Sequence, residues 1–415
     1  MKSCLILVTN LYPYSLGEAF LEPEVPFLAK QFDKVITLSI GLDKDAELTR
    51  TVPKNFDCYN ITSIPKKINR AISLFNGAVN FLRPARDVED EAKKSIKHRL
   101  FYEYFTARGE REFALCEKIL DKYDFSEYDS VTVYSYWFFV AALVASKIYD
   151  KLSAECENVK FVSRAHGHDV YREANPIGYI PKRRFLLDKI DAVYPCSVNG
   201  EKYIREGYPE YSDKISHRYL GTVGNGTSCM SEDEFHLVSC SRMIPLKRLD
   251  RIASALLLLD KENPGKIRWT HIGSGETSEA VKQLCEGLEN IKAEFLGEIP
   301  NEAVGEFYRT NSVDMLINTS NTEGLPVSMM EAMSFSIPVL ATDVGGVGEI
   351  VKDSYNGFLI DENFTDELLA QKIKEIILSS KQEREAMRRN ARSFWEENFD
   401  AEKNFTAFAG EICCS

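Results

Sequence analysis

The second half of the chain alternates short apolar runs with helical stretches, and this alternation constrains the fold more than any other feature. Runs rich in β-branched and aromatic residues predict six strands: Phe235–Ser241, Ile267–Gly273, Ile291–Gly297, Val313–Ser320, Ile337–Asp343 and Asn356–Ile360. Helical patterns lie between them, at Leu249–Leu259, Ser278–Leu288, Asn301–Asn311, Pro326–Phe335 and Thr365–Leu378. Strands joined by helical crossovers favour a parallel sheet with helices on both faces. The sequence therefore predicts an α/β, Rossmann-like domain.

The first half repeats the pattern less regularly. Strands are expected at Cys4–Thr9, Lys34–Ile40, Ser130–Tyr136, Val159–His166, Ala192–Ser197 and Lys214–Leu220. Between residues 64 and 121 helical composition replaces the alternation, which predicts an insertion on the first sheet. Three glycines between Gly221 and Gly226 suit a flexible hinge. We therefore predict a first domain over 1–221, a second over 222–394, and a C-terminal helical segment over 395–415, since 415 residues exceed one ordinary core.

Composition excludes several function classes. A formal charge of −12 disfavours both nucleic acid and anionic lipid as partners, so any affinity for either must be local. The longest uncharged apolar stretch, Tyr134–Ser146, is far shorter than the roughly 20 residues of a membrane span. The first ten residues contain an apolar run too short for a secretory signal. Ten cysteines without a C-x-x-C pair suit neither a zinc ribbon nor a disulfide framework, so we expect a cytoplasmic protein.

Charged residues follow two predicted strands of the second half, and ligands of open α/β sheets bind at the carboxyl ends of strands. Arg242 and Lys247 follow the first of these strands and suit a diphosphate. Glu323 and Glu331 follow the fourth and can accept hydrogen bonds from a polyhydroxylated ligand. Between them Pro326 is placed at the first helical position, where free amides favour an anion. The alternative is a basic loop before a helix and a solvated glutamate.

Other motifs are less specific. His166 ends a predicted strand beside Gly167, which leaves room for a substrate, although a histidine satisfied within the core is the alternative. A binuclear metal site would need further Asp and His residues that the segment after Asp169 lacks. Gly273-Ser274-Gly275 begins like a dinucleotide fingerprint, but Ser278 stands where its third glycine would be. No metal and no cofactor are predicted.

With these motifs in order, the sequence resembles the retaining glycosyltransferases of the GT-B fold, family 4. The resemblance rests on segments in the order and approximate spacing of that family: Ser241-Arg242 with Lys247 and Asp250, His271 to Gly275, Glu323-Gly324-Leu325-Pro326 with Glu331-Ala332, Ile337-Pro338-Val339, and Gly345-Gly346. In the first half, Ser163 to Gly167 with Asp169-Val170-Tyr171, and Tyr134 to Phe138, look like the branch that builds bacterial exopolysaccharides such as colanic acid and amylovoran.

The resemblance implies two Rossmann-like domains facing each other across a cleft, with the C-terminal helix returning to the first domain. It implies a nucleotide-diphosphate sugar as donor, with Arg242 and Lys247 on the diphosphate, Glu331 on the ribose, and Glu323 on the donor sugar. Four residues are implied at the reacting centre: His166, Arg242, Lys247 and Glu323. The implied donor contacts also include Gly17, Gly273, Ser274, Gly324, Leu325 and Pro326. Family enzymes need no metal, and the departing phosphate itself takes the acceptor proton.

The acceptor is implied to be a saccharide or a lipid-linked saccharide. A GT-B epimerase or hydrolase of the nucleotide sugar, or a non-catalytic binding protein, are the alternative functions. Residues 64–111 hold eleven Lys and Arg against six Asp and Glu, and Ile64, Ile68, Ala71, Ile72, Phe75, Val79 and Leu82 share one helical face. Such a segment suits peripheral contact with the inner face of a membrane. The alternative is an apolar stripe packed on the first sheet, with a solvated basic face.

Overall fold

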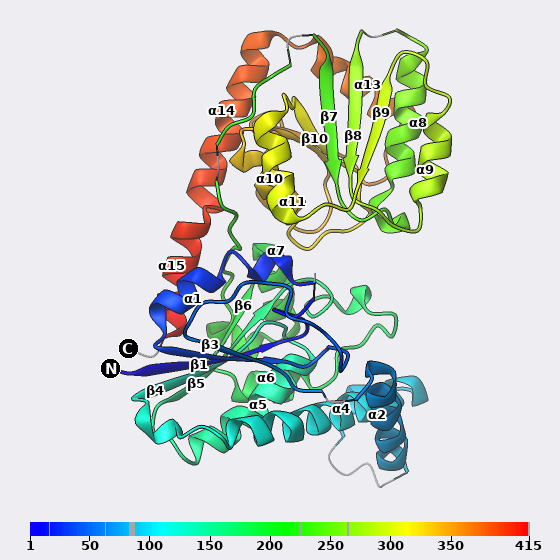
Figure 1. Ribbon diagram of the computed structural model, residues 1–415. Coiled ribbons are helices and arrows are strands. Elements are labelled where there is room, and N and C mark those ends of the chain that lie inside the picture. Colours follow the sequence, from blue (N-terminus) through cyan, green and yellow to red (C-terminus); the bar gives the residue numbers. More distant parts are fainter. Residues whose placement is uncertain are drawn as a thin grey trace. The chain divides into compact units, whose positions relative to one another are not determined.

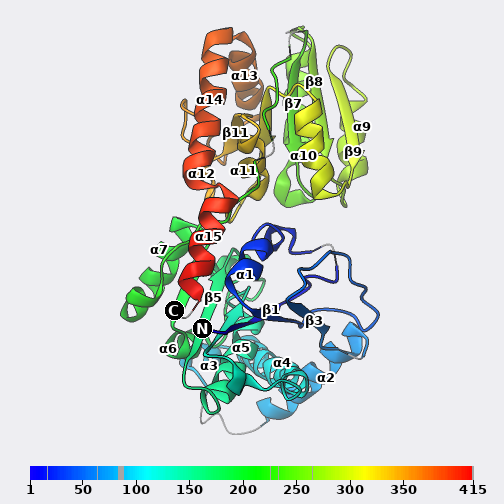
Figure 2. The ribbon, with the colours of Figure 1, turned by 60° about the vertical axis from the view of Figure 1, so that its left-hand side comes forward.

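The computed structural model describes residues 1–15, 17–62, 64–82, 88–224, 226–231, 233–263 and 265–413. The chain divides into two compact units. Unit 1 is Met1–Tyr219 with Phe405–Ser415, and unit 2 is Leu220–Asn404. Each unit contains its own six-stranded sheet with helices packed against it (Figures 1 and 2). The prediction of two Rossmann-like α/β units is confirmed.

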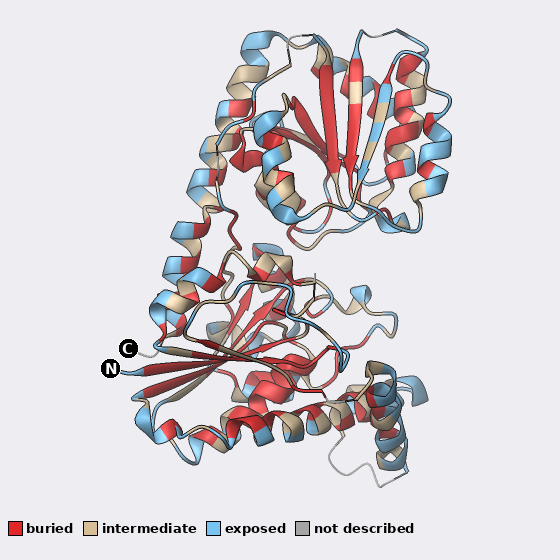
Figure 3. Cartoon of the chain, viewed as in Figure 1, coloured by how far each residue is buried: buried red, intermediate tan, exposed pale blue. Residues whose placement is uncertain are grey.

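The sheet of unit 1 has the strand order β3-β2-β1-β4-β5-β6, and all its neighbouring strands are parallel. Its strands are β1 (Ser3–Thr9), β2 (Lys34–Ser39), β3 (Phe56–Asn60), β4 (Ser130–Ser135), β5 (Val159–Ala165) and β6 (Ala192–Pro195). Its helices are α1 (Val25–Gln31), α2 (Lys66–Phe81), α3 (Asp90–Lys93), α4 (Ile96–Leu120), α5 (Val140–Ser153), α6 (Arg183–Lys189) and α7 (Val198–Gly207). Every residue of β1 and β4 is buried, as expected for central strands with helices on both faces (Figure 3).

In unit 1 one strand was missed and one predicted strand is absent from the described residues. Edge strand β3 was not predicted, because its sequence Phe-Asp-Cys-Tyr-Asn is mostly polar and half-exposed. The expected strand Lys214–Leu220 does not form, although the amides of Ser216 and Arg218 donate to β6. A parallel ladder also needs hydrogen bonds from the amides of β6 back to this segment. These bonds do not form, because Pro195 has no N–H and the Arg218 carbonyl accepts from the Arg164 side chain instead.

The sheet of unit 2 has the order β12-β11-β10-β7-β8-β9 and is also parallel. Its strands are β7 (Phe235–Cys240), β8 (Ile267–Ile272), β9 (Lys292–Gly297), β10 (Met315–Asn318), β11 (Val339–Thr342) and β12 (Gly357–Ile360). Its helices are α8 (Leu249–Asp260), α9 (Ser278–Cys285), α10 (Asn301–Thr310), α11 (Val327–Ser334), α12 (Val347–Ile350), α13 (Asp366–Leu378), α14 (Lys381–Asn398) and the start of α15 (Ala401–Ile412). All six strands predicted from the alternation are present.

The glycines of the expected hinge permit close packing within unit 2. A Cβ on Gly221 would lie 2.5 Å from the Cα of Ala401, and one on Gly224 would lie 2.4 Å from the ring of Trp395. The Trp395 indole donates to the Thr222 hydroxyl at 2.8 Å. These glycines therefore let the segment lie directly against α14 and α15. Asn225, within the expected hinge, lies outside the described residues.

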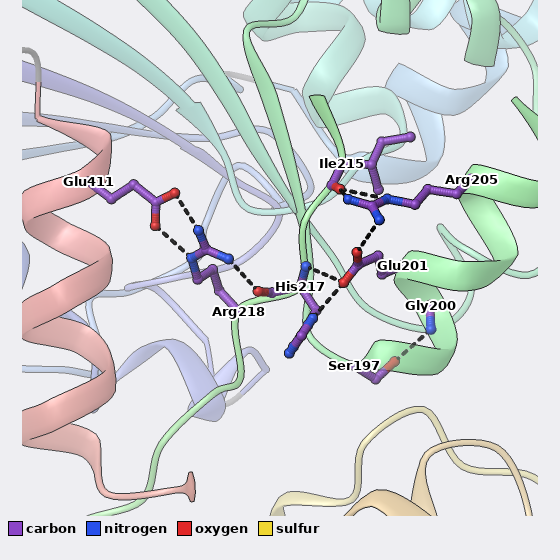
Figure 4. A network of polar contacts seen from close by, with 8 residues as sticks. All are labelled: Ser197, Gly200, Glu201, Arg205, Ile215, His217, Arg218 and Glu411. Carbon is purple, nitrogen blue, oxygen red and sulfur yellow. Dashed lines mark hydrogen bonds and ion pairs between the residues drawn. The ribbon is translucent and has the colours of Figure 1, made fainter. Parts of the chain in front are cut away.

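The end of α15 packs into unit 1. The Phe408 ring lies 5.7 Å from the ring of Tyr134, and the Arg164 guanidinium lies 3.8 Å from the Phe408 ring centroid. Arg164 also pairs with Glu24 at 3.0 Å, and both side chains are fully buried. At the surface, Arg218 donates two hydrogen bonds of 2.6 Å to Glu411 (Figure 4). These contacts make unit 1 discontinuous in sequence.

The described part of residues 64–121 is helical and consists of α2, α3 and α4. Helix α4 packs against both α2 and α5, so it joins α2 to the rest of unit 1. Among the described residues, no helix combines the length and apolar character needed to cross a membrane.

Candidate functional site

Two loops at the carboxyl edge of the second sheet are joined to each other by hydrogen bonds. One follows β7 and contains Lys247, and the other follows β10 and contains Glu323. The Asn321 amide donates to the Leu246 carbonyl at 2.9 Å. The Thr319 hydroxyl donates to the Lys247 carbonyl at 3.1 Å. These bonds fix the backbone on both sides of the two charged side chains.

Lys247 and Glu323 form the centre of this site. The Lys247 ammonium donates to Glu323 Oε1 at 2.5 Å, and both side chains are mostly buried. Asn318 and Ser320 donate to the same oxygen at 3.1 and 2.6 Å. Within the described part of the chain, Oε2 of Glu323 and two of the three ammonium hydrogens are thus left for a ligand.

A third loop, after β11, packs on the backbone of the Glu323 loop. Gly345 has φ +54°, and a Cβ on it would lie 1.8 Å from the Glu323 carbonyl oxygen. The Gly346 amide donates to the Gly324 carbonyl at 2.9 Å. Glycine is therefore required at this point, both for its backbone conformation and for the close approach.

The β7 and β8 loops are pressed together in the same way. Gly273 has φ +133°, and a Cβ there would lie 1.9 Å from the Ser241 carbonyl oxygen. The Ser274 carbonyl accepts a hydrogen bond from the Met243 amide at 2.8 Å. Between these contacts the Arg242 side chain is exposed, and among the described residues its guanidinium has no hydrogen-bond or ion-pair partner. Gly273 and Ser274 therefore position the loop that carries this free cation.

Helix α11 starts at Val327, and Pro326 is its N-cap, so the prediction of Pro326 at the first helical position was wrong by one residue. The reason is the ψ angle of 107° at Pro326, which is extended and not helical. No side chain caps the helix within the described residues. Its first amides therefore remain available to an anion. Leu325, which precedes the cap, is buried.

Glu331 lies one helical turn further along α11. Desolvation raises its pKa to about 7, although a hydrogen bond with Asn301 opposes the rise. The carboxyl group therefore changes charge near neutral pH, whereas an ordinary glutamate titrates near 4.5. Its described contact is with Asn301 of α10 and not with the Lys247–Glu323 pair.

In unit 1, His166 lies at the carboxyl end of β5 in an aromatic cluster. Its ring centroid lies 5.3, 4.9 and 4.5 Å from those of Phe20, Tyr136 and Trp137. The ring is buried, its Nδ1 lies 3.8 Å from the Asp169 carboxylate, and Nε2 has no hydrogen-bond partner within the described residues. The His166 amide donates to Asp169 at 2.8 Å. Burial alone would raise the pKa of Asp169, but hydrogen bonding and charge from His166 hold it well below its usual range.

Glu18 is a buried residue of unit 1 that the sequence analysis did not select. Its carboxylate accepts from the amides of Asn10, Leu11 and Tyr12 at 3.0, 2.7 and 2.6 Å, and from the Trp137 indole. The amides after β1 therefore bind a protein carboxylate. Gly17 precedes it, and the implied contact of Gly17 with a donor stays a prediction. A lone glutamate in a loop has no sequence signature that would reveal these bonds.

A family match and the sequence relatives agree on one class of enzyme. Residues 230–394 match the family described as Glycosyl transferases group 1. The uncharacterized glycosyltransferase MJ1178 of Methanocaldococcus jannaschii is 26% identical over 266 residues, which are 63% of this chain and 69% of that protein. The amylovoran biosynthesis glycosyltransferase AmsD of Erwinia amylovora is 30% identical over 165 residues, 39% of this chain and 44% of that protein.

The chain carries a group 1 glycosyltransferase domain. A crystal structure of Anabaena Alr3699/HepE in complex with UDP aligns with a TM-score of 0.64 at 16% identity, covering 99% of each chain. At this identity the likeness shows the fold, and the predictions of a GT-B fold and of a glycosyltransferase are confirmed. The Lys247–Glu323 pair, Arg242 and Glu331 all lie within the matched residues of the glycosyltransferase domain.

Replacing Gly345 should disrupt the glycosyltransferase domain. Gly345→Ala places a methyl group against the Glu323 carbonyl and forces alanine into a left-handed conformation. We expect a loss of at least about 2 kcal/mol in the free energy of unfolding, measured by urea denaturation. Gly305→Ala in α10, whose Cβ would lie 3.6 Å from Phe335, is the control and should not destabilise. Equal stability of the two variants would contradict the packing argument.

Glu331→Gln should stabilise the chain in a pH-dependent way. Because folding raises the pKa of this carboxyl to about 7, the wild type loses stability as the pH rises from about 4.5 to 7 and stays less stable above it. We expect the stability advantage of Glu331→Gln to grow by about 2 kcal/mol between pH 5 and pH 8. Urea unfolding at pH 5, 6.5 and 8 measures it, with Glu286→Gln as a surface control. An advantage that does not change with pH would refute this account.

Proposed function

We propose that the chain is a retaining, metal-independent glycosyltransferase that moves a sugar from a nucleotide-diphosphate sugar to a saccharide or lipid-linked acceptor. The observation that carries the proposal is the Lys247–Glu323 pair at the carboxyl edge of the second sheet. Lys247 lies in the loop after β7, which also contains the unpaired Arg242. A cation with free hydrogens and a carboxylate with a free oxygen suit a ligand that has both phosphates and hydroxyl groups.

In this proposal Arg242 and Lys247 bind the diphosphate. Both cations counter the negative charge that builds on the leaving group as the bond to the sugar breaks. The uncapped amides of α11 add further positive potential at the same edge of the sheet. This supply of charge from the chain itself is the reason for proposing a metal-independent reaction.

Two carboxylates would recognise the hydroxyl groups of the donor. Oε2 of Glu323 accepts from the sugar, with the backbone of Gly324 and Leu325 beside it, and Glu331 accepts from the ribose. Burial of Glu331 makes this second contact pH-dependent, because only the ionised form has both oxygens free to accept. The proposed contact between Glu323 and the sugar is preorganised, because Lys247, Asn318 and Ser320 orient the carboxylate in the unliganded chain.

His166 is proposed to contact the transferred sugar. Its Nδ1 faces the Asp169 carboxylate at 3.8 Å, which leaves Nε2 for a hydroxyl group of the sugar, and the surrounding aromatic rings exclude water. Retention follows from attack on the same face that the phosphate leaves, with the phosphate oxygen taking the acceptor proton. No residue of the chain is proposed as the base or as the nucleophile.

The proposed setting is surface polysaccharide biosynthesis at the cytoplasmic side of the membrane. It is supported by the relative AmsD, which is named for amylovoran biosynthesis. A uridine nucleotide is the first donor to test, because the HepE structure was determined with UDP.

Lys247→Ala should abolish stabilisation by the correct nucleoside diphosphate. We expect one of UDP, GDP, ADP, TDP and CDP to raise the melting temperature of the wild type, with or without EDTA. Loss of a charge-assisted contact should weaken this binding by about 10- to 100-fold in Lys247→Ala. Lys261→Ala, at an exposed position after α8, should bind as the wild type does. No stabilisation by any nucleotide at millimolar concentration would refute the proposed donor site.

The reaction should depend on an acceptor and preserve the anomeric configuration. With a donor selected by the nucleotide test, ¹H NMR coupling constants should show a new glycoside of the same configuration as the donor sugar, formed only when acceptor is present. An epimerised or hydrolysed donor without acceptor would instead support the isomerase or hydrolase function. A nucleotide that binds without any turnover would support a non-catalytic binding protein.

A further inference from the structure

Helix α2 packs through its small and polar side chains. Asn69, Ser73 and Gly77 are buried, and they recur every four residues on one face of the helix. A Cβ on Gly77 would lie 2.9 Å from the Cα of Tyr104, so the backbones of α2 and α4 approach closely. Arg111 of α4 donates a hydrogen bond to the Asn69 side chain. The alternative, in which the apolar stripe of this helix packs on the first sheet, is therefore wrong.

The apolar face of α2 is exposed instead. Large side chains on it and just after it are accessible to solvent: Ile68 (51%), Phe75 (70%), Val79 (39%) and Leu82 (84%). The start of α4 adds Ile96 (72%) and Leu100 (43%). Single exposed apolar residues are ordinary, but a group of this size on neighbouring elements marks an interaction surface.

The two helices bring these residues to the same end of a helical pair. Gly77 lies against Tyr104, and the Arg99 guanidinium lies 6.0 Å from the ring of Phe81. The helices are therefore antiparallel, and the end of α2 lies beside the start of α4. This places Leu82 at the same end of the pair as Ile96.

Charge indicates what covers this apolar face. Helix α2 has no acidic residue, and it begins with Lys66 and Lys67, followed by Arg70 one turn later. Residues 64–111 carry a net charge of +5 from eleven basic and six acidic residues, in a chain of net charge −12. This surface attracts an anionic partner. A second copy of the chain on the same face would bring two positive segments together, which disfavours self-association.

We propose that the exposed face of α2 docks on an anionic lipid bilayer. Phe75, Val79 and Leu82 enter the boundary between headgroups and acyl chains, as in interfacial amphipathic helices. Lys67, at the edge of this face, contacts lipid phosphates, and Arg70, further round the helix, adds to the positive potential. The proposal rests on exposure and charge in unit 1 and is independent of the proposed donor site in unit 2. It also gives a reason for a lipid-linked acceptor, since docking brings the enzyme to the surface that holds such molecules.

Sedimentation of the full-length protein with lipid vesicles tests the proposal. We expect the protein to bind vesicles of 30% phosphatidylglycerol in phosphatidylcholine and to bind pure phosphatidylcholine at least tenfold more weakly. Raising the salt from 0.05 to 0.5 M should weaken binding to the anionic vesicles, because it screens the charges. Protein that stays in the supernatant under all these conditions would overturn the proposal.

Two double variants separate the apolar and the electrostatic contributions. Phe75→Ser with Leu82→Ser, and Lys67→Glu with Arg70→Glu, should each bind anionic vesicles at least tenfold more weakly. Leu378→Ser, which changes an equally exposed apolar residue of α13 in unit 2, is the control and should bind as the wild type does. All four substituted residues are exposed, so melting temperature and nucleotide-induced stabilisation should not change.

Two outcomes of these variants would count against the bilayer as occupant. Equal loss of binding in Leu378→Ser would show general adsorption to lipid. A dimer detected by light scattering in the wild type but absent in the Phe75→Ser, Leu82→Ser variant would show that a second copy covers the face.

Discussion

Parallel pairing of every neighbouring strand in unit 2 is the constraint from which its site follows. A parallel ladder requires each strand to be followed by a crossover, so the carboxyl ends of β7, β8, β10 and β11 share one edge. The loops at that edge then compete for the same space. Gly273 and Gly345 allow the loops to pack closely, because each lies where a side chain would overlap the carbonyl oxygen of a neighbouring loop. The close packing in turn fixes Lys247 at hydrogen-bond distance from Glu323.

The electrostatics of the site follow from this placement. Lys247 and Glu323 compensate each other in the unliganded chain, so neither charge is buried alone. Arg242 has no partner among the described residues and remains available to an anion. In the proposed function, a diphosphate contacts both Arg242 and Lys247 without first breaking the contact that orients Glu323. Glu331 differs from Glu323, because no cation among the described residues compensates the desolvation of its carboxyl group, and its pKa is raised.

Much of the second unit could be predicted from sequence, because its strands are short apolar runs and its charged residues follow their ends directly. The limits have physical causes. The strand expected near Ser216 fails because of the missing N–H of Pro195, which lies about twenty residues away in sequence. The Glu18 carboxylate accepts hydrogen bonds from three backbone amides. Every residue except proline has such an amide, so the residue types in the sequence do not reveal these bonds. The spacing of apolar residues also shows that α2 is amphipathic, but it does not show which face of the helix is buried.

The orientation of α2 illustrates that last point in energetic terms. Burying its apolar stripe would remove more apolar area from water than burying Asn69, Ser73 and Gly77 does. The structure nevertheless buries the small residues, because they let two helix backbones approach within van der Waals distance and let Arg111 reach Asn69. Such packing leaves Phe75 and Leu82 in solvent, which is unfavourable for an isolated chain. An anionic bilayer removes that unfavourable exposure. Lys67 at the edge of the apolar face, with Arg70 further round the helix, gives an electrostatic attraction that a purely apolar partner would not use.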